Sequence, residues 1–260
     1  MTAAEQSSDL VSDADVVAPS TSTPTARAAE QQLLRGLHGQ IVDNLGRRIV
    51  SGQYAPGESL SQESLLDEFG ISRTVLREAM RVLADKGLVS SRQRLGTQIA
   101  ARTSWRLLDS DMLRWLGSQP DDSFLDQLAE VRAIVEPASA RFAAERRSDE
   151  DVAKLRSALD AMATAAANSD AEAAIEADLA FHRALLDSMH NELMSRMEIV
   201  IEAGLRARNE RVHAGQHVPE FVSVHAAIVD AVEAGDGEAA AAATIALLEQ
   251  ATRDTSIAAD

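Results

Sequence analysis

Three side chains in the second half of the chain have the residue types of a metal site. Asp178 and His182 are four residues apart, so a helix places the carboxylate and the imidazole on one face. His225 follows in a later segment with helical apolar periodicity. A mixed oxygen and nitrogen set suits zinc, nickel or manganese better than a metal that prefers thiolates. Helical Asp and His pairs are also common on protein surfaces, and the residue types alone leave both interpretations open.

A second group of side chains is basic and lies in the first hundred residues. Arg73, Arg77 and Arg81 recur at one-turn spacing on a predicted helix, and Arg92 and Arg94 lie at the tip of a predicted β-hairpin. The N-terminal end of a recognition helix reaches base edges in the major groove, where Arg bonds guanine in bidentate fashion. A basic hairpin tip enters the minor groove or holds phosphates. This arrangement favours binding to duplex DNA over a solvated helix face.

Charge is distributed unevenly along the 260 residues, whose net charge is −16. Residues 1–32 carry one basic against five acidic side chains, residues 33–102 carry ten against seven, and residues 103–260 carry fourteen against twenty-nine. A phosphate-binding face must be positive whatever the rest of the protein carries. Residues 33–102 are therefore the part of the chain suited to nucleic acid.

Composition excludes several other classes of protein. Because the chain has no Cys, it has no disulfide scaffold, thiolate zinc site or cysteine nucleophile. No apolar run approaches the roughly 20 residues that span a bilayer, and no basic region followed by an apolar block indicates a signal peptide. We therefore expect a cytoplasmic protein with no membrane partner, which is associated with the nucleoid when it is bound to DNA.

Three helices and a hairpin would position the basic residues. Residues 1–32 contain almost no large apolar side chain and are predicted to be a disordered tail. Apolar residues recur every four positions over 37–49, a short helix ends at Gly70, and Ser72 caps a third helix. Two strand-like pieces then flank the basic tip. Residues 33–102 are therefore predicted to form a winged helix-turn-helix.

The rest of the chain is predicted to be helical. A helical linker over 103–120 contains a helix at about 105–116, and residues 121–257 form an antiparallel bundle, because the breaks between apolar-periodic segments are short and polar. The predicted helices of the bundle span 124–145, 150–168, 171–189, 191–212, 219–234 and 237–257. The predicted fold class is mainly α, an N-terminal winged helix-turn-helix followed by an all-α antiparallel helical bundle that binds a ligand and dimerises.

The first part of the chain resembles a known family. The segments YAPGESL at 54–60 and FGISRTVLREAM at 69–80, followed by KGLV at 86–89, resemble the winged-helix domain of the GntR family of bacterial transcription regulators. The resemblance implies that Arg73 and Arg77 make the main contacts with DNA bases.

The wing and one helix position extend this comparison. The resemblance implies that Gly96 lets the wing approach DNA closely. The predicted DNA-contacting residues are Ser72, Arg73, Thr74, Arg77, Arg81, Arg92, Arg94 and Gly96. Glu63 departs from the pattern, because family members often have Arg at this position. A carboxylate cannot hold a phosphate but can accept a bond from cytosine N4, so the operator differs at one base pair or the contact is missing.

The second half is similar to the FCD-type sensor domain of the FadR branch of this family. The similarity is carried by VRAIVEP at 131–137, DLAFH at 178–182, HN at 190–191 and the residues that follow His225. Many members bind a divalent metal through one Asp and three His, with an organic acid over the metal. The metal ligands implied here are Asp178, His182 and His225. At the position of the expected fourth ligand this chain has Leu247, which cannot bind a metal. The site is therefore either completed by water and effector oxygens or lost.

The resemblance further implies an effector pocket in the bundle. Arg132 on the first helix is expected to point inward, where its guanidinium matches a carboxylate. The alternative is an i, i+4 ion pair with Glu136 on the surface. Arg206 and Arg211 are further candidates for the same cavity. The predicted effector-binding residues are thus Arg132, Asp178, His182, His225, Arg206 and Arg211. Residues 108–115, together with residues 131–145, resemble regulators of sugar-acid catabolism, in particular galactonate-type repressors.

The sequence therefore predicts a homodimeric transcriptional regulator, a repressor first of all, and no enzyme. It would bind double-stranded operator DNA and be released by a small carboxylic or sugar acid such as an aldonate. One alternative is a metal-dependent hydrolase that uses Asp178, His182 and His225, although no separate nucleophile, acid–base pair or Gly-rich phosphate loop is found. Another is a non-specific DNA-coating protein, against which the acidic second half argues.

Overall fold

The computed structural model describes the backbone of residues 24–92, 96–118, 122–212 and 220–257, and the side chains of residues 36–91, 96–118, 123–207 and 221–253. The first helix, α1 (Pro24–Val50), begins inside the segment predicted to be a tail. Pro at the first helical position followed by Ala, Glu and Gln provides helix propensity without the apolar period on which the prediction relied. The remainder of the predicted tail lies outside the described residues.

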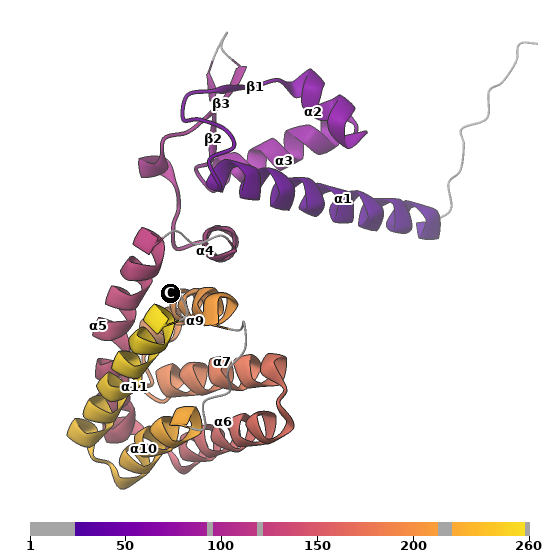
Figure 1. Ribbon diagram of the computed structural model, residues 1–260. Coiled ribbons are helices and arrows are strands. Elements are labelled where there is room, and N and C mark those ends of the chain that lie inside the picture. The colour runs from indigo at the N-terminus through magenta and orange to yellow at the C-terminus, as the bar shows by residue number, and fades with distance from the viewer. Residues whose placement is uncertain (1–23, 93–95, 119–121, 213–219, 258–260) are drawn as a thin grey trace, which may run out of the picture.

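The N-terminal part of the chain is a winged helix-turn-helix (Figure 1). After α1 come β1 (Ser59–Leu60), α2 (Gln62–Phe69), α3 (Arg73–Asp85), β2 (Val89–Arg92) and β3 (Gly96–Ile99). The strands form an antiparallel sheet in the order β1-β3-β2, and Arg92 pairs with Gly96 across the wing. β1 is too short to show an alternating pattern and is not predicted from the sequence. The shared apolar core includes Leu45, Leu65, Leu76, Leu83, Leu88 and Ile99.

Two local signals fix where α3 begins. Gly70 ends α2 with a φ of 60°, in the left-handed region that favours glycine. Ser72 then caps α3, because its Oγ accepts a hydrogen bond from the Val75 N–H at 3.4 Å. Val75, Leu76 and Leu83 lie on the buried face of α3, so the opposite face is free for a ligand. The predicted end of the second helix at Gly70 and the predicted start of the third helix after Ser72 are confirmed.

The connection between the two parts is only partly helical. It contains a 3₁₀ turn, η1 (Arg102–Ser104), and α4 (Ser110–Gly117), so the predicted helix over 105–116 is wrong for residues 105–109. The carboxylate of Asp109 accepts hydrogen bonds from two N–H groups in the first turn of α4 and therefore starts the helix at this point.

The C-terminal part is an antiparallel helical bundle. Its helices are α5 (Asp122–Arg146), α6 (Asp149–Asn168), α7 (Ala171–Asp187), α8 (Glu192–Ser195), α9 (Glu198–Val212), α10 (Glu220–Ala234) and α11 (Gly237–Ile257). The predicted helix over 191–212 is two helices, because the Met197 N–H donates to the Met194 carbonyl at 2.9 Å and the α-helical pattern is interrupted. α11 packs along α5 and α10, and α6 packs along α7 (Figure 1). No helix in the described part of the chain has both the length and the apolar character needed to cross a membrane.

Candidate functional site

A cluster of buried ionisable side chains lies between α5, α7 and α10. Asp178 and His182 come from α7, His225 from α10, and Arg132 and Glu136 from α5. None of the five residues is more than 6% exposed. Burial of charged groups is costly unless they are paired, so this cluster is built from mutual contacts. The structure thus brings together four of the predicted site residues and adds Glu136.

The first three of these residues fit a divalent metal. Oδ1 of Asp178 lies 3.4 Å from Nε2 of His182 and 3.2 Å from Nε2 of His225. Ligands held at usual zinc distances around a tetrahedron are about 3.3 Å apart. Asp178 Oδ1 and His225 Nε2 are buried without a hydrogen-bond partner, and a cation between them would satisfy both. Three protein ligands leave at least one coordination position for water or an effector oxygen.

Neighbouring groups orient both imidazoles. Nδ1 of His225 lies 2.7 Å from the backbone oxygen of Phe221, so its N–H donates there and the Nε2 lone pair faces Asp178. Nδ1 of His182 lies 3.2 Å from Oε2 of Glu136, which is the arrangement of a carboxylate behind a metal-binding histidine. Edge-on packing of Phe181 against both rings restricts their rotation.

The cluster keeps its charges through these contacts. Burial alone would raise the pKa values of Asp178 and Glu136, but the imidazoles and Arg132 outweigh burial and lower both, that of Glu136 to about 2. Burial also disfavours the charged form of His182, whereas Glu136 and Asp178 raise its pKa to about 9. Metal binding at His182 therefore requires the loss of a proton from its ring.

The predicted Arg132–Glu136 ion pair is present, but it is buried inside the bundle and not on the surface. Nε of Arg132 lies 2.5 Å from Oε1 of Glu136, and their side chains are 8% and 2% exposed. Gly204 of α9 packs against the Arg132 side chain, since an added Cβ would lie 3.1 Å from its Cδ. Arg132 therefore points inward, as predicted, but an internal carboxylate already binds it. The sequence signal for Glu136 is its place one turn before the buried Ala140 on the apolar stripe of α5.

Two positions singled out in the sequence, Arg206 and Leu247, lie outside this cluster. Arg206 is on the surface, where it pairs with Glu176 at 3.0 Å and with Glu202 at 2.9 Å, so the structure does not bring it to the buried cluster. The side chain of Arg211 lies outside the described residues. Leu247 is 5% exposed and packs in the apolar core of the bundle, where it supplies no ligand.

The cluster adjoins a very small hollow between α7 and α9. His182 contributes to its wall, together with apolar residues of both helices, and the hollow has a volume of about 10 Å³. This volume holds a single water. Arg183 of α7 pairs with Glu198 of α9 at 3.0 Å at the edge of the hollow, with Arg183 half exposed. Exposed ion pairs of this kind contribute only about 0–1 kcal/mol, so they hold α9 weakly.

The exposed face of α3 carries the predicted base-contacting residues. The side chains of Arg77 and Arg81 are 78% and 68% exposed, and Arg73 and Thr74 are also exposed at the N-terminal end of the helix. Glu78 lies 3.2 Å from Arg81 and 3.9 Å from Arg77. The structure therefore presents these arginines on one free helix face.

The wing and α2 complete this surface. Gly96 has a φ of 76°, which favours glycine, and an added Cβ would meet no atom within 4 Å. Its backbone is thus open to a close approach. The side chains of Arg92 and Arg94 lie outside the described residues. Glu63 is exposed in the first turn of α2, where a carboxylate suits the helix N-terminus.

A close contact joins the winged domain to α4. The ring of Trp115 lies directly on α1, because a Cβ added to Gly46 would be 2.4 Å from it. The indole N–H donates to Oδ1 of Asp43 at 2.8 Å. Lys86, directly after α3, pairs with Asp109 at 2.7 Å and with Asp111 at 2.8 Å on the other side of the connection. These contacts fix α4 to the winged domain.

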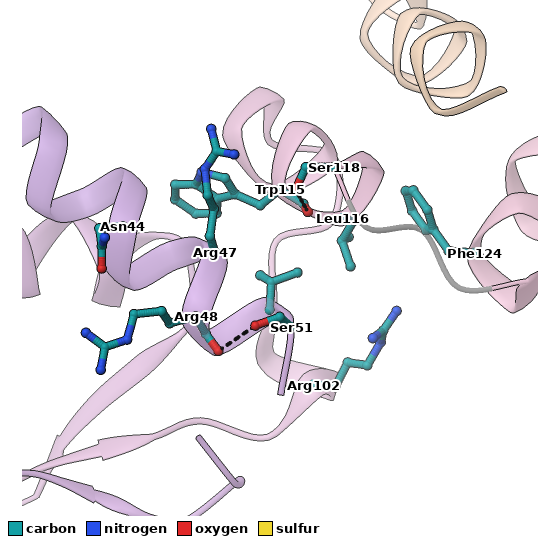
Figure 2. A pocket seen from close by; sticks show the side chains of 10 residues that line it. Asn44, Arg47, Arg48, Ser51, Arg102, Trp115, Leu116, Ser118 and Phe124 are labelled. Carbon is teal, nitrogen blue, oxygen red and sulfur yellow. Dashed lines mark hydrogen bonds between the residues drawn. The ribbon is translucent and has the colours of Figure 1, made fainter. Parts of the chain in front are cut away.

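Beside this contact lies a cavity of about 360 Å³ between the two parts of the chain. Figure 2 shows Phe124 of α5 pointing toward Leu116 of α4, while the Arg48 guanidinium points away from the other labelled side chains. The cavity is lined by Asn44, Arg47, Arg48, Val50, Ser51, Arg102, Trp115, Leu116, Ser118 and Phe124. The two parts are therefore not close-packed here, which leaves room for movement between them.

The chain matches known families over both parts. The model for bacterial regulatory proteins of the gntR family matches residues 37–99, and the FCD domain matches residues 127–250. The galactonate operon transcriptional repressor of Escherichia coli K12 is 39% identical, over 82% of this chain and 94% of that protein. The transcriptional regulator LutR of Bacillus subtilis 168 is 32% identical, over 77% of this chain and 92% of that protein. The solved structure of Lar from Listeria monocytogenes has the same fold, with a TM-score of 0.59 at 21% identity over 85% of this chain and 96% of that one.

The fold and the family match define a DNA-binding transcriptional regulator of bacterial type, in which a winged helix-turn-helix is joined to an all-helical domain with a buried polar cluster. The chain belongs to the GntR family and carries an FCD domain in its C-terminal part. Regulators of this family bind operator DNA, and FCD domains can bind metals. The similar proteins are transcriptional regulators and not enzymes, so the hydrolase alternative has no support.

Proposed function

We propose that the protein is a repressor of a carbohydrate-acid catabolic operon, which leaves its operator when a small carboxylic or sugar acid such as an aldonate binds the FCD domain. The observation that carries this proposal is the buried cluster, in which the Arg132 guanidinium lies near the three candidate metal ligands. This cluster lies inside the FCD domain, which α4 joins to the winged domain. The name of the galactonate operon repressor, at 39% identity, supports the class of effector.

The DNA contacts follow from the exposed face of α3. Arg73 and Arg77 reach base edges in the major groove from the N-terminal end of the helix. Arg81, paired with Glu78, is better placed to contact the sugar-phosphate backbone of DNA. Ser72 and Thr74 are exposed where a phosphate group would approach. The wing contributes Gly96, and Arg92 and Arg94 belong to the proposal from the sequence alone.

In the FCD domain, Asp178, His182 and His225 would hold a divalent metal, which supplies a positive charge and open coordination positions to a carboxylate or hydroxyl group of the effector. Arg132 binds an effector carboxylate through the part of its guanidinium that Glu136 does not occupy. The polyhydroxy body of a sugar acid suits such a polar site.

Binding is coupled to DNA release through α9. Since the hollow beside His182 holds about 10 Å³, a sugar acid enters only when α7 and α9 separate. At the edge of the hollow these two helices are joined by an exposed ion pair between Arg183 and Glu198, and beneath it by apolar packing. The other side of α9 packs on α4, where Ala203 and Ala207 lie 3.8 Å from an added Cβ at Gly117. α4 in turn is fixed to the winged domain, so a shift of α9 changes the orientation of the winged domain relative to the FCD domain. A ligand shifts this equilibrium only if it prefers the non-binding arrangement.

A homodimer matches a two-fold symmetric operator. Two winged domains would read half-sites in successive major grooves. Ile134 of α5 and Ile245 of α11 are 74% and 48% exposed on neighbouring helices, and a second copy of the chain would cover them. Light scattering at the concentration used for DNA binding should give twice the mass of the chain.

Operator binding is tested by fluorescence anisotropy with a fragment of the protein's own promoter and a scrambled fragment. The wild type should bind the promoter fragment and release it when an aldonate is added, and equal retention of both fragments would support a DNA-coating protein instead. Arg73→Ala and Arg77→Ala should abolish promoter binding, whereas Arg196→Ala, which removes an exposed Arg of the FCD domain, should leave it unchanged.

The effector site is tested in the same assay. Arg132→Ala should still bind the promoter but no longer respond to the aldonate, and an unchanged dose curve would contradict the assignment. Elemental analysis of the purified protein should find up to one divalent metal per chain, and His182→Ala should lower that content. A wild type that is free of metal after gentle purification would remove the metal from the proposal.

A further inference from the structure

We propose that Glu136 is a specificity-determining residue, whose buried carboxylate restricts the effector site to acids that carry a single carboxylate. This inference rests on the proposed function, because it concerns the acid that binds the same site. The sequence predicts no part for Glu136 beyond pairing with Arg132, and the role proposed here comes from its position between Arg132 and His182.

Glu136 contacts both halves of the site. Its Oε1 accepts a hydrogen bond from Nε of Arg132 at 2.5 Å, and its Oε2 lies 3.2 Å from Nδ1 of His182. The residue is 1% exposed, and Oε2 has no hydrogen-bond partner in the described structure. A buried carboxylate is kept only where positive charges compensate it, so Glu136 is part of the charge arrangement of the site.

The charges of the cluster favour a single negative charge on the effector. Arg132 is cationic, Glu136 and Asp178 are anionic, and both imidazoles are neutral when they bind a metal. With a divalent cation at the three ligands, the site has one net positive charge. A monocarboxylate neutralises that charge, whereas a dicarboxylate leaves one negative charge without compensation in a water-poor interior.

In the described part of the bundle, no second buried cation is available for a second carboxylate, and Arg183 at the edge of the hollow already pairs with Glu198 at 3.0 Å. Among the described residues of the bundle, the buried ionisable side chains outside the cluster reduce to Asp151, which pairs with His190 at 2.9 Å. The walls of the hollow next to His182 are apolar on both helices, apart from Arg183, Glu198 and Glu202 near the surface. The negative charge of Glu136 thus decides how many negative charges the effector can bring.

The experiment compares galactonate with galactarate, which have the same six-carbon polyol skeleton and differ by one carboxylate. Affinities are measured by titration calorimetry with the full chain loaded with one equivalent of zinc. The wild type should bind galactonate at least ten-fold more tightly than galactarate. Glu136→Gln keeps the side-chain volume and removes the charge, so it should reduce this preference at least ten-fold or reverse it.

Two control variants separate charge from structure. Glu130→Gln removes an exposed carboxylate from the same helix and should keep the wild-type preference. Glu136→Asp retains the charge and should also retain the preference, even if both affinities fall. The zinc content and melting temperature of each variant are measured in parallel, so that a loss of metal or of fold is distinguished from a change of selectivity.

Several outcomes overturn the proposal. If Glu136→Gln lowers the affinity for both acids by the same factor, the preference is unchanged and Glu136 has only a structural role. A wild type that binds both acids equally refutes the charge argument even if no Glu136 variant folds. If the wild type binds neither acid yet binds zinc and its promoter, the sugar-acid part of the proposed function fails. The same comparison with acetate and malonate then decides the role of Glu136.

Discussion

Gly46→Ala tests the contact through which, in the proposed function, the FCD domain acts on the winged domain. An added Cβ would lie 2.4 to 2.6 Å from three ring atoms of Trp115, closer than carbon atoms approach one another. Trp115 is 2% exposed, and its indole N–H bond to Asp43 holds the ring in place. The ring must therefore move away from α1, and the bond to Asp43 must lengthen or break.

The size of the effect follows from two opposing contributions. Forcing an extra carbon into a packed contact costs about 1–3 kcal/mol. Replacing Gly by Ala inside a helix stabilises by about 0.5–1 kcal/mol. We expect Gly46→Ala to be destabilised by about 1 kcal/mol on balance. Gly39→Ala, on the same helix with no atom within 4 Å of the added Cβ, should be stabilised by about 0.5–1 kcal/mol.

The assay is urea unfolding of the full chain, followed by circular dichroism and by tryptophan fluorescence. Gly46→Ala should unfold at a lower urea concentration than the wild type, and Gly39→Ala at a higher one. Gly46→Ala should also show a smaller change of operator affinity when the effector is added, because α4 no longer moves with α1. If both variants unfold at the same urea concentration, the described packing of Trp115 on α1 is wrong.

Three further predictions concern single side chains. The hydrogen bonds of Trp115 and two arginines outweigh burial and lower the pKa of Asp43 to about 2 from 3.8, so its stabilisation is complete above about pH 4 and is lost as the pH falls through 2. Asp43→Asn should therefore be less stable than the wild type by about 1 kcal/mol at pH 7, allowing for solvent screening, and this difference should shrink in chemical unfolding as the pH falls from 4 toward 2. Leu247→His offers the bundle a fourth imidazole and should raise zinc affinity at least ten-fold in competition with a chelator; an affinity equal to that of the wild type would show that α11 does not reach the metal. Arg206→Ala removes only exposed ion pairs and should leave the effector dose curve unchanged in the anisotropy assay, whereas a shifted curve would return Arg206 to the effector site.

Local signals predict much of the winged domain. Ser72 and Gly70 act through hydrogen bonds and backbone conformation within a few residues, so their roles are visible in the sequence. The connection between the two parts is harder to predict from the sequence, because its first part is held by residues that are distant in the chain. The backbone N–H of Arg106 donates to the Lys86 carbonyl, and the Lys86 side chain binds Asp109, contacts that no local pattern encodes.

The buried site was predictable only in part for a similar reason. The spacing of Asp178 and His182 places both on one helix face, and this follows from helix geometry alone. Whether that face is buried depends on tertiary packing. Arg132 and Arg206 both have a Glu four residues away on their helix, yet the first pair is inside the bundle and the second is on the surface. For Glu136 the sequence predicts only an ion pair on the surface, because its burial depends on how α5 packs against α7 and α9.

The single-water hollow next to His182 has a consequence for timing. An acid that enters only while α7 and α9 are apart binds no faster than the helices separate, so its association rate reaches a plateau as its concentration rises. The same closure delays escape of the bound acid. Under the proposed function, release of the operator would therefore be no faster than the opening of these two helices.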